Sequence, residues 1–149
     1  MHLELANSDE LGAANVGRMP MSEVRTAEIE GWVDTGAVHL VLPQTIVEQL
    51  GLKPAGQTRA TLADGTVRIR DYVKNVWVSL NGRDGVFRAI VEPGRDDALI
   101  GAVILEELDL YVDPVTGTCH PRHPNAMISE MGSDEYIPGT PIEPTPGES

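Results

Sequence analysis

Apolar and polar residues alternate along most of the chain, which is the pattern of half-buried β-strands. Between residues 25 and 33, Ala27, Ile29 and Val33 fall on one side, and Glu28 and Glu30 fall on the other. The same period predicts strands at 2–7, 38–42, 58–70, 76–80, 86–91, 98–100, 110–112 and 118–120. Asp64-Gly65 is a strong hairpin signal and divides 58–70 into two arms. After residue 7, a stretch with Asn, Gly and Pro predicts a loop.

Two short segments have helical spacing instead. Residues 46–50 carry an apolar stripe that follows Pro43 and ends at Gly51, and 103–108 has room for barely two turns. Segments 46–52 and 104–110 share four identities in seven positions. Either short amphipathic helices simply look alike, or the domain is built from two strand–glycine–helix units, with 32–36 corresponding to 98–101. The whole pattern predicts an all-β fold, a closed barrel or sandwich with one or two short helices.

Composition narrows the class of protein. The 149 residues carry 11 Lys and Arg against 23 Asp and Glu, a net charge of −12, which argues against a nucleic-acid partner. No apolar run approaches the ~20 residues of a membrane span, and no secretory signal is visible. The single cysteine, Cys119, excludes an intrachain disulfide framework. We therefore expect a cytoplasmic domain without a membrane partner.

The last part of the sequence differs from the rest. Residues 121–149 hold six of the 11 prolines and show neither strand nor helix periodicity. Such a segment buries too little apolar surface to offset its ordering entropy. The sequence predicts a folded domain at 1–120 and a Pro-rich, acidic, disordered tail at 121–149.

The tetrapeptide Asp34-Thr35-Gly36-Ala37 carries the strongest chemical signal. It places a carboxylate at the end of an apolar strand, next to a hydroxyl and to a glycine that allows another backbone or a substrate to approach closely. A capped turn after a strand would have the same local pattern. Trp32 and Trp77 are interpreted as packing residues, although Trp32 is near enough to Asp34 to border a cleft, and Asp96-Asp97 as solvated charge.

The wider context resembles the retropepsin-like (retroviral-type) aspartic proteases, especially their small bacterial members. The resemblance covers about Glu23 to Pro121. It rests on 32–37 with Val41-Leu42-Pro43, on the hairpin at 61–66, on 99–101, and on 105–108 followed by Val112-Asp113-Pro114.

This resemblance implies a function and a site. Asp34 would be the catalytic acid, and Thr35, Gly36 and Ala37 would support its loop, with Thr35 bracing two such loops against each other. The flap over the substrate would comprise Leu62, Ala63, Asp64, Gly65 and Thr66. The strand behind the catalytic loop would comprise Leu99, Ile100 and Gly101.

Aspartic proteolysis needs two carboxylates that share a proton, with water as nucleophile. The chain has one Asp-Thr/Ser-Gly triplet, so the resemblance implies a symmetric homodimer that hydrolyses a peptide or protein substrate with two copies of Asp34 and no cofactor. Cys119, His120 and His123 would leave a metal with an unnamed fourth ligand, so no metal site is predicted.

One departure from the family pattern leaves alternatives open. Ala102-Val103 follow Gly101 where polar residues are common in the family, so a buttressing contact is missing or supplied otherwise. This favours the rival hypothesis of a catalytically silent dimeric module that binds extended peptides by β-addition. A β-rich structural subunit is a third hypothesis.

Overall fold

The structure is a computed structural model that describes residues 1–61 and 64–123. Nine strands occur in this part of the chain: β1 (His2–Asn7), β2 (Thr26–Val33), β3 (Leu40–Pro43), β4 (Gly56–Thr61), β5 (Val67–Leu80), β6 (Arg83–Glu92), β7 (Ala98–Ile100), β8 (Leu110–Val112) and β9 (Cys119–Pro121). The helices are α1 (Ser8–Asn15), α2 (Gln44–Gln49) and α3 (Ala102–Glu107), with a 3-10 turn at Met21–Glu23. The predicted all-β fold with short helices is confirmed.

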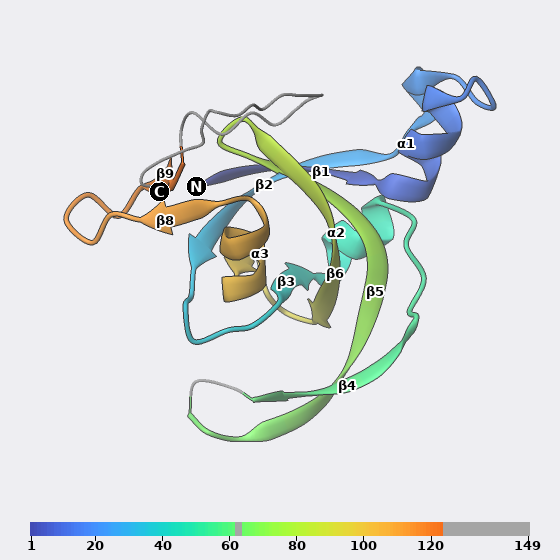
Figure 1. Ribbon diagram of the computed structural model, residues 1–149. Coiled ribbons are helices and arrows are strands. Elements are labelled where there is room, and N and C mark those ends of the chain that lie inside the picture. Colours follow the sequence, from blue (N-terminus) through green and yellow to red (C-terminus); the bar gives the residue numbers. More distant parts are fainter. Residues whose placement is uncertain (62–63, 124–149) are drawn as a thin grey trace.

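Six strands close into a barrel (Figure 1). Their order is β1-β2-β7-β3-β6-β5, and the pairing of β5 with β1 completes the ring. β4 pairs only with β5 and forms a hairpin arm outside the ring. Closure leaves the ring strands with neighbours on both sides, so the free edge of this sheet lies on β4.

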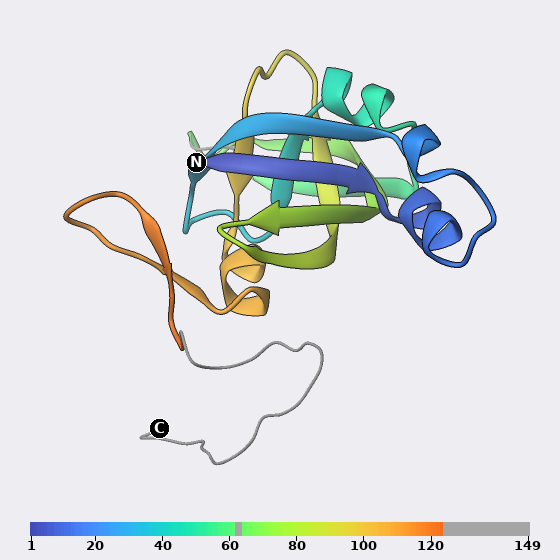
Figure 2. The same cartoon turned by 90° about the horizontal axis from the view of Figure 1, so that it is seen from above.

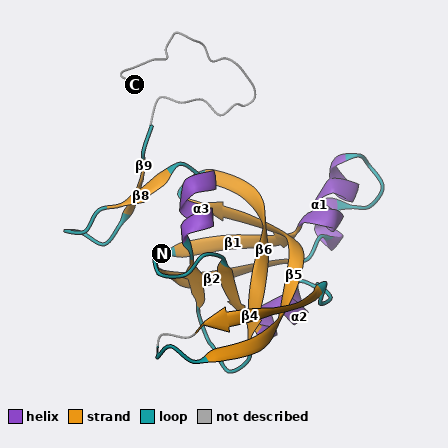
Figure 3. Cartoon of the chain, turned by 60° about the horizontal axis from the view of Figure 1, so that its bottom comes forward, coloured by secondary structure: helices purple, strands orange, loops and turns teal. Residues whose placement is uncertain are grey.

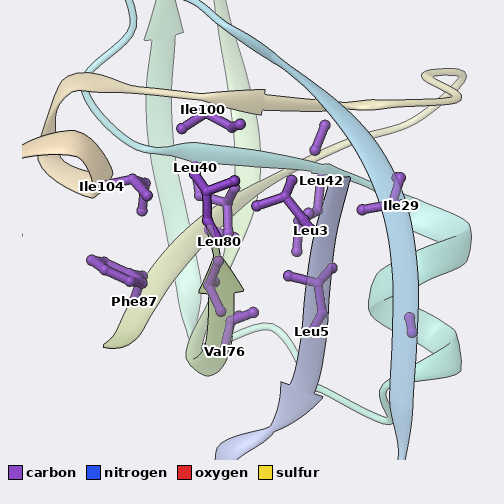
Figure 4. Packing of buried hydrophobic residues seen from close by; sticks show 14 of the residues in the cluster. Leu3, Leu5, Ile29, Leu40, Leu42, Val76, Leu80, Phe87, Ile100 and Ile104 are labelled. Atoms are coloured by element: carbon purple, nitrogen blue, oxygen red, sulfur yellow. The ribbon is translucent and has the colours of Figure 1, made fainter. Parts of the chain in front are cut away.

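The barrel is filled by aliphatic side chains (Figure 4). Alternation in β1 turns Leu3 and Leu5 inward, and alternation in β3 does the same for Leu40 and Leu42. Each is at most 1% exposed. Burial of one such side chain stabilises the folded state by about 1.5–3 kcal/mol. The packed core therefore holds the barrel strands in fixed positions.

The barrel contains an internal two-fold repeat. β2 runs parallel to β7, and β6 runs parallel to β3, so exchanging β2 with β6 and β3 with β7 reproduces the pairing. β3 and β7 cross once, at Val41 and Leu99. Helix α2 follows β3, and helix α3 follows β7, the strand that is equivalent to β3 in the repeat. This arrangement supports the predicted two-unit domain. The expected equivalence of 32–36 with 98–101 is wrong, because the loop equivalent to 34–39 is 93–97.

Two elements differ from the sequence predictions. The segment expected to be a loop after residue 7 begins with helix α1, capped by the Asn7 side chain, which accepts a hydrogen bond from the Glu10 N–H at 3.1 Å. The strands expected at 67–70 and 76–80 form one continuous strand, β5. It contains a register shift between Val73 and Val76, where Asn75 has a φ of 63°.

Helix α1 and the strands β8 and β9 also lie outside the ring of six strands (Figure 1). β8 and β9 form a separate two-stranded sheet that projects beside the N-terminus, whereas α1 lies at the opposite end (Figures 2 and 3). Hydrogen bonding continues through His123, whose N–H and ring both bond to Asp109. The predicted tail lies outside the described residues from 124 onward. Within the described ranges, no helix is long and apolar enough to cross a membrane.

Candidate active site

Asp34 directly follows Val33, the last residue of β2. Its backbone N–H donates to the Ile100 carbonyl at 3.0 Å, and its carbonyl accepts from the Ala37 N–H at 3.0 Å. The carboxylate Oδ1 accepts the Gly36 N–H at 3.0 Å, which closes a tight turn. Asp34, Thr35 and Gly36 are exposed. The loop thus presents a carboxylate to solvent on a backbone fixed at both ends.

Strand β7 passes directly behind this loop. The Ala102 N–H donates to the Ala37 carbonyl at 2.9 Å, and the Val103 N–H donates to the Val38 carbonyl at 3.0 Å. A β-carbon on Gly101 would lie 2.7 Å from the Val38 carbonyl oxygen, so only glycine fits there. Leu99 pairs with Trp32, and Ile100 is fully buried. Strand β7 therefore contacts the loop through the Ile100 carbonyl, and the first two N–H groups of α3 bond to the far end of the loop.

The β4–β5 hairpin reaches the same end of the barrel as the Asp34 loop (Figures 1 and 2). Its turn is ordered by Asp64, whose Oδ1 accepts from the Thr66 N–H at 2.9 Å and from the Thr66 hydroxyl at 2.6 Å. These bonds lower the pKa of the Asp64 carboxyl. Gly65 has a φ of 86°, as a tight turn requires. Leu62 and Ala63 lie outside the described residues.

A Trp–Asp–Arg cluster stands beside the loop. The Trp32 indole N–H donates to the Asp97 Oδ2 at 2.5 Å, and the Asp97 Oδ1 pairs with Arg95 at 2.9 Å. Trp32 is 63% exposed, so its interpretation as a packing residue is wrong. Asp97 is paired rather than merely solvated. The sequence gives no local signal for this cluster, since Trp32 and Asp97 are 65 residues apart.

The three residues considered as a metal corner have separate partners. Cys119 is buried and donates to the Met1 sulfur at 3.2 Å, and burial raises the pKa of its thiol. His120 bonds to the Thr118 hydroxyl, whereas His123 bonds to the Asp109 carboxylate. Among the described residues, no group of three or more His, Cys, Asp or Glu side chains could hold a metal ion.

Both the sequence and the fold of the chain are similar to those of known proteins. The family model for "Aspartyl protease" matches residues 22–104, more than half of the chain, including the Asp34 loop and Gly101. Among solved structures, the simian foamy virus protease is 17% identical, with a TM-score of 0.42 and coverage of 54% of this chain and 84% of that chain. The retroviral protease-like domain of Ddi1 from Leishmania major is 18% identical, with a TM-score of 0.48 and coverage of 64% and 79%. Comparison with curated proteins gives no match. On the family match, the chain belongs to the aspartyl protease family.

Proposed function

We propose that the protein is a homodimeric aspartic endopeptidase in which Asp34 of each protomer forms half of a catalytic pair. Two carboxylates about 3 Å apart cannot both carry a charge, so the pair would share one proton. The ionised carboxyl would take a proton from water as the water attacks the peptide carbonyl. The protonated one would donate a hydrogen bond to the carbonyl oxygen. No metal or cofactor is needed for this chemistry.

The proposal rests on the exposure and the hydrogen bonding of the Asp34 carboxylate. Its carboxylate is exposed, and within the described residues its one hydrogen bond comes from the Gly36 N–H, to Oδ1. That donor orients the carboxylate while leaving Oδ2 for water or for a second carboxyl group. The surrounding backbone bonds fix the loop, and a fixed charge needs little reorganisation during the reaction.

A dimer is proposed because the protomer offers half of this machinery. The sequence contains one Asp-Thr-Gly triplet. Thr35 is exposed, and its hydroxyl makes no hydrogen bond among the described residues. A two-fold axis beside Asp34 would bring two carboxylates together and would give each Thr35 hydroxyl a partner. The substrate would be an extended peptide held between the Asp34 loops and the β4–β5 hairpins.

The rival hypothesis of a silent peptide-binding module is based on the apolar residues Ala102 and Val103, which stand where polar residues are common in the family. The structure gives these positions a role that does not need polar side chains, because their N–H groups bond to the Ala37 and Val38 carbonyls. The departure from the family pattern therefore leaves the loop braced. This favours the enzyme over the silent module.

A peptide library derived from a proteome, analysed by mass spectrometry, tests the proposed activity. The wild-type protein should cleave peptides, and a pepstatin-type inhibitor should abolish the cleavage. Asp34→Asn should stay folded and dimeric but inactive, because an amide cannot act as a general base. Asp113→Asn is the matched control, since Asp113 also accepts a backbone N–H two residues ahead, at 2.8 Å. Peptide binding without cleavage by the wild type would support the silent module instead.

A further inference from the structure

Basic residues gather on the β4–β5 hairpin and on the next strand of an otherwise acidic chain. Residues 53–74, which include the hairpin, hold five Lys and Arg against two Asp. The chain as a whole has a net charge of −12. The hairpin reaches out from the barrel, as Figure 1 shows. The charge of this region is therefore opposite to the charge of the remaining chain.

The strand period places these cations on one side of the sheet. Val73 is fully buried in the core, so the residues that alternate with it lie on the outer side of β5. Tyr72 is one of them, and it pairs with Ile90 of β6. Arg88, two residues before Ile90, lies over the Tyr72 ring with its guanidinium carbon 4.6 Å from the ring centroid. The outer side of these two strands carries four basic residues, which we call the basic face: Arg68, Arg70, Lys74 and Arg88.

Most of the positive charge on the basic face is free to bind a ligand. Arg70 is partly buried and pairs with Glu92 at 2.9 Å. Arg68, Lys74 and Arg88 are exposed, and within residues 1–61 and 64–123 none of them forms an ion pair. Neighbouring cations without partners favour a ligand that carries several carboxylates.

The segment 124–149 has the matching chemistry. It contains no Lys, Arg or His and five acidic residues: Glu130, Asp134, Glu135, Glu143 and Glu148. We propose that the first three of these, the acidic triplet, bind the basic face of the same chain, so that the segment attaches to the outer side of the β4–β5 hairpin arm. This inference goes beyond the proposed function and does not depend on it.

The point at which the described chain ends favours this ligand. The Arg83 guanidinium donates to the His123 carbonyl at 3.2 Å, which holds His123 at the first residue of β6. Arg88 lies five residues farther along β6, and Lys74 lies six residues before the β5 residue that pairs with Arg83. These separations are about 17 and 20 Å. Seven residues join His123 to Glu130 and span up to about 24 Å, which is long enough to reach either cation.

Spacing and attachment both favour more than one contact. Glu130 and Glu135 are five residues apart and span up to about 17 Å when extended, close to the roughly 20 Å between Arg68 and Lys74 along β5. A single exposed ion pair stabilises little. Attachment to the chain at His123, however, gives the carboxylates an effective concentration on the order of millimolar at the basic face.

The first test is a zero-length cross-link. The chain contains two lysines, Lys53 and Lys74. A water-soluble carbodiimide should join the Lys74 amine to a carboxyl group of the acidic triplet as an amide, which mass spectrometry of a digest locates. At 1 M salt, where charges are screened beyond about 3 Å, the yield should fall several-fold. Lys74→Arg should lose the product. Cross-links from the triplet to Lys53 alone would overturn the inference.

Isotope mixing tests whether the segment belongs to the same chain. Protein labelled with ¹⁵N and unlabelled protein are mixed and equilibrated before cross-linking. Each cross-linked peptide pair should then be fully labelled or fully unlabelled. Pairs that join a labelled to an unlabelled peptide would assign the basic face to a second copy of the chain and would contradict the proposal.

Amide chemical shifts give a test that needs neither a lysine nor catalytic activity. Neutralising the acidic triplet should shift the amides at 68–74 and 86–90 and leave those of α1 unchanged. Salt should shift the same amides in the wild type. The triple variant is Glu130→Gln, Asp134→Asn, Glu135→Gln.

The cations are tested in the same measurement. In a Lys74→Gln, Arg88→Gln background, neutralising the triplet should cause shifts that are several-fold smaller, because the partners are gone. Arg18→Gln removes an exposed cation after α1 and is the matched control, which should leave the effect intact. Absence of shifts on the basic face in the triple variant would overturn the inference, whether or not the protein cleaves peptides. If a separate acidic peptide then shifts these amides, the face belongs to a partner instead.

Discussion

Gly101 and His39 approach so closely that a β-carbon added at Gly101 would lie 2.4 Å from the His39 carbonyl oxygen. The contact joins the end of β7 to the chain that leaves the Asp34 loop. It allows the N–H groups of Ala102 and Val103 to reach the Ala37 and Val38 carbonyls. The glycine therefore allows the start of α3 to pack closely against the chain that leaves the Asp34 loop.

Gly101→Ala should destabilise the protein by about 1–3 kcal/mol or more, because backbone atoms must move to admit the methyl group. Gly12→Ala is the control. Gly12 lies in α1 with nothing within 4 Å of an added β-carbon, and this substitution should stabilise the helix by about 0.5–1 kcal/mol. Denaturant unfolding of both variants measures the difference. Equal stabilities would contradict the close contact.

Asn7→Ala should destabilise the protein by about 2–4 kcal/mol. Asn7 is 6% exposed, and its side chain accepts from the Glu10 N–H and donates to the Leu50 carbonyl at 2.9 Å. Asn7→Ser keeps a hydroxyl acceptor for the helix cap but loses the donor to Leu50, so an intermediate stability is expected. Thermal unfolding of the two variants tests this ranking, and an unperturbed alanine variant would contradict it.

The Asp64 carboxyl should titrate below its ordinary pKa, because Thr66 donates two hydrogen bonds to its ionised form. With a folded pKa lower than the unfolded one, the turn gains support above the ordinary pKa and loses it as the pH falls through the lowered value. Carbon-detected NMR of the Asp64 carboxyl measures this. In Thr66→Val the pKa should return toward its ordinary value. An identical titration in both proteins would remove the proposed cause.

Dimer formation should be visible in the concentration dependence of activity. Specific activity should fall on dilution, because each half-site lacks its second carboxyl group. Each chain carries a net charge of −12, and salt screens the repulsion over about 8 Å at physiological ionic strength. Sedimentation should therefore show a tighter dimer at higher salt. A monomer with full specific activity would exclude a shared catalytic pair.

The barrel strands could be predicted because alternation and burial coincide in them. In β2, every second residue from Ala27 to Gly31 is buried. The apolar stripe of α2 and the turn at Asp64-Gly65 are equally local signals. Helix α1 escaped prediction because it buries none of its residues and so has no apolar stripe. The signal that could have revealed it is Asn7 followed three residues later by Glu10, a helix-capping pattern.

The candidate site was predictable where it depends on a short motif. Asp34 and Gly101 were identified from the residues around them and from the family resemblance. Trp32, Asp97 and Arg95 were not grouped, because the parallel pairing of β2 with β7 brings them together from distant parts of the chain. The continuity of β5 was also missed, since the residues around Asn75 do not alternate through the register shift.

A mixing experiment tests the shared use of Asp34 most directly. Wild-type protein is co-refolded with an equal amount of Asp34→Asn at constant total concentration, and peptide cleavage is measured. Random pairing makes about a quarter of the dimers fully wild type, so activity should be about a quarter of that of the wild type alone. A remaining activity of about half would mean that each chain works by itself and would contradict a catalytic pair formed by two Asp34 carboxylates.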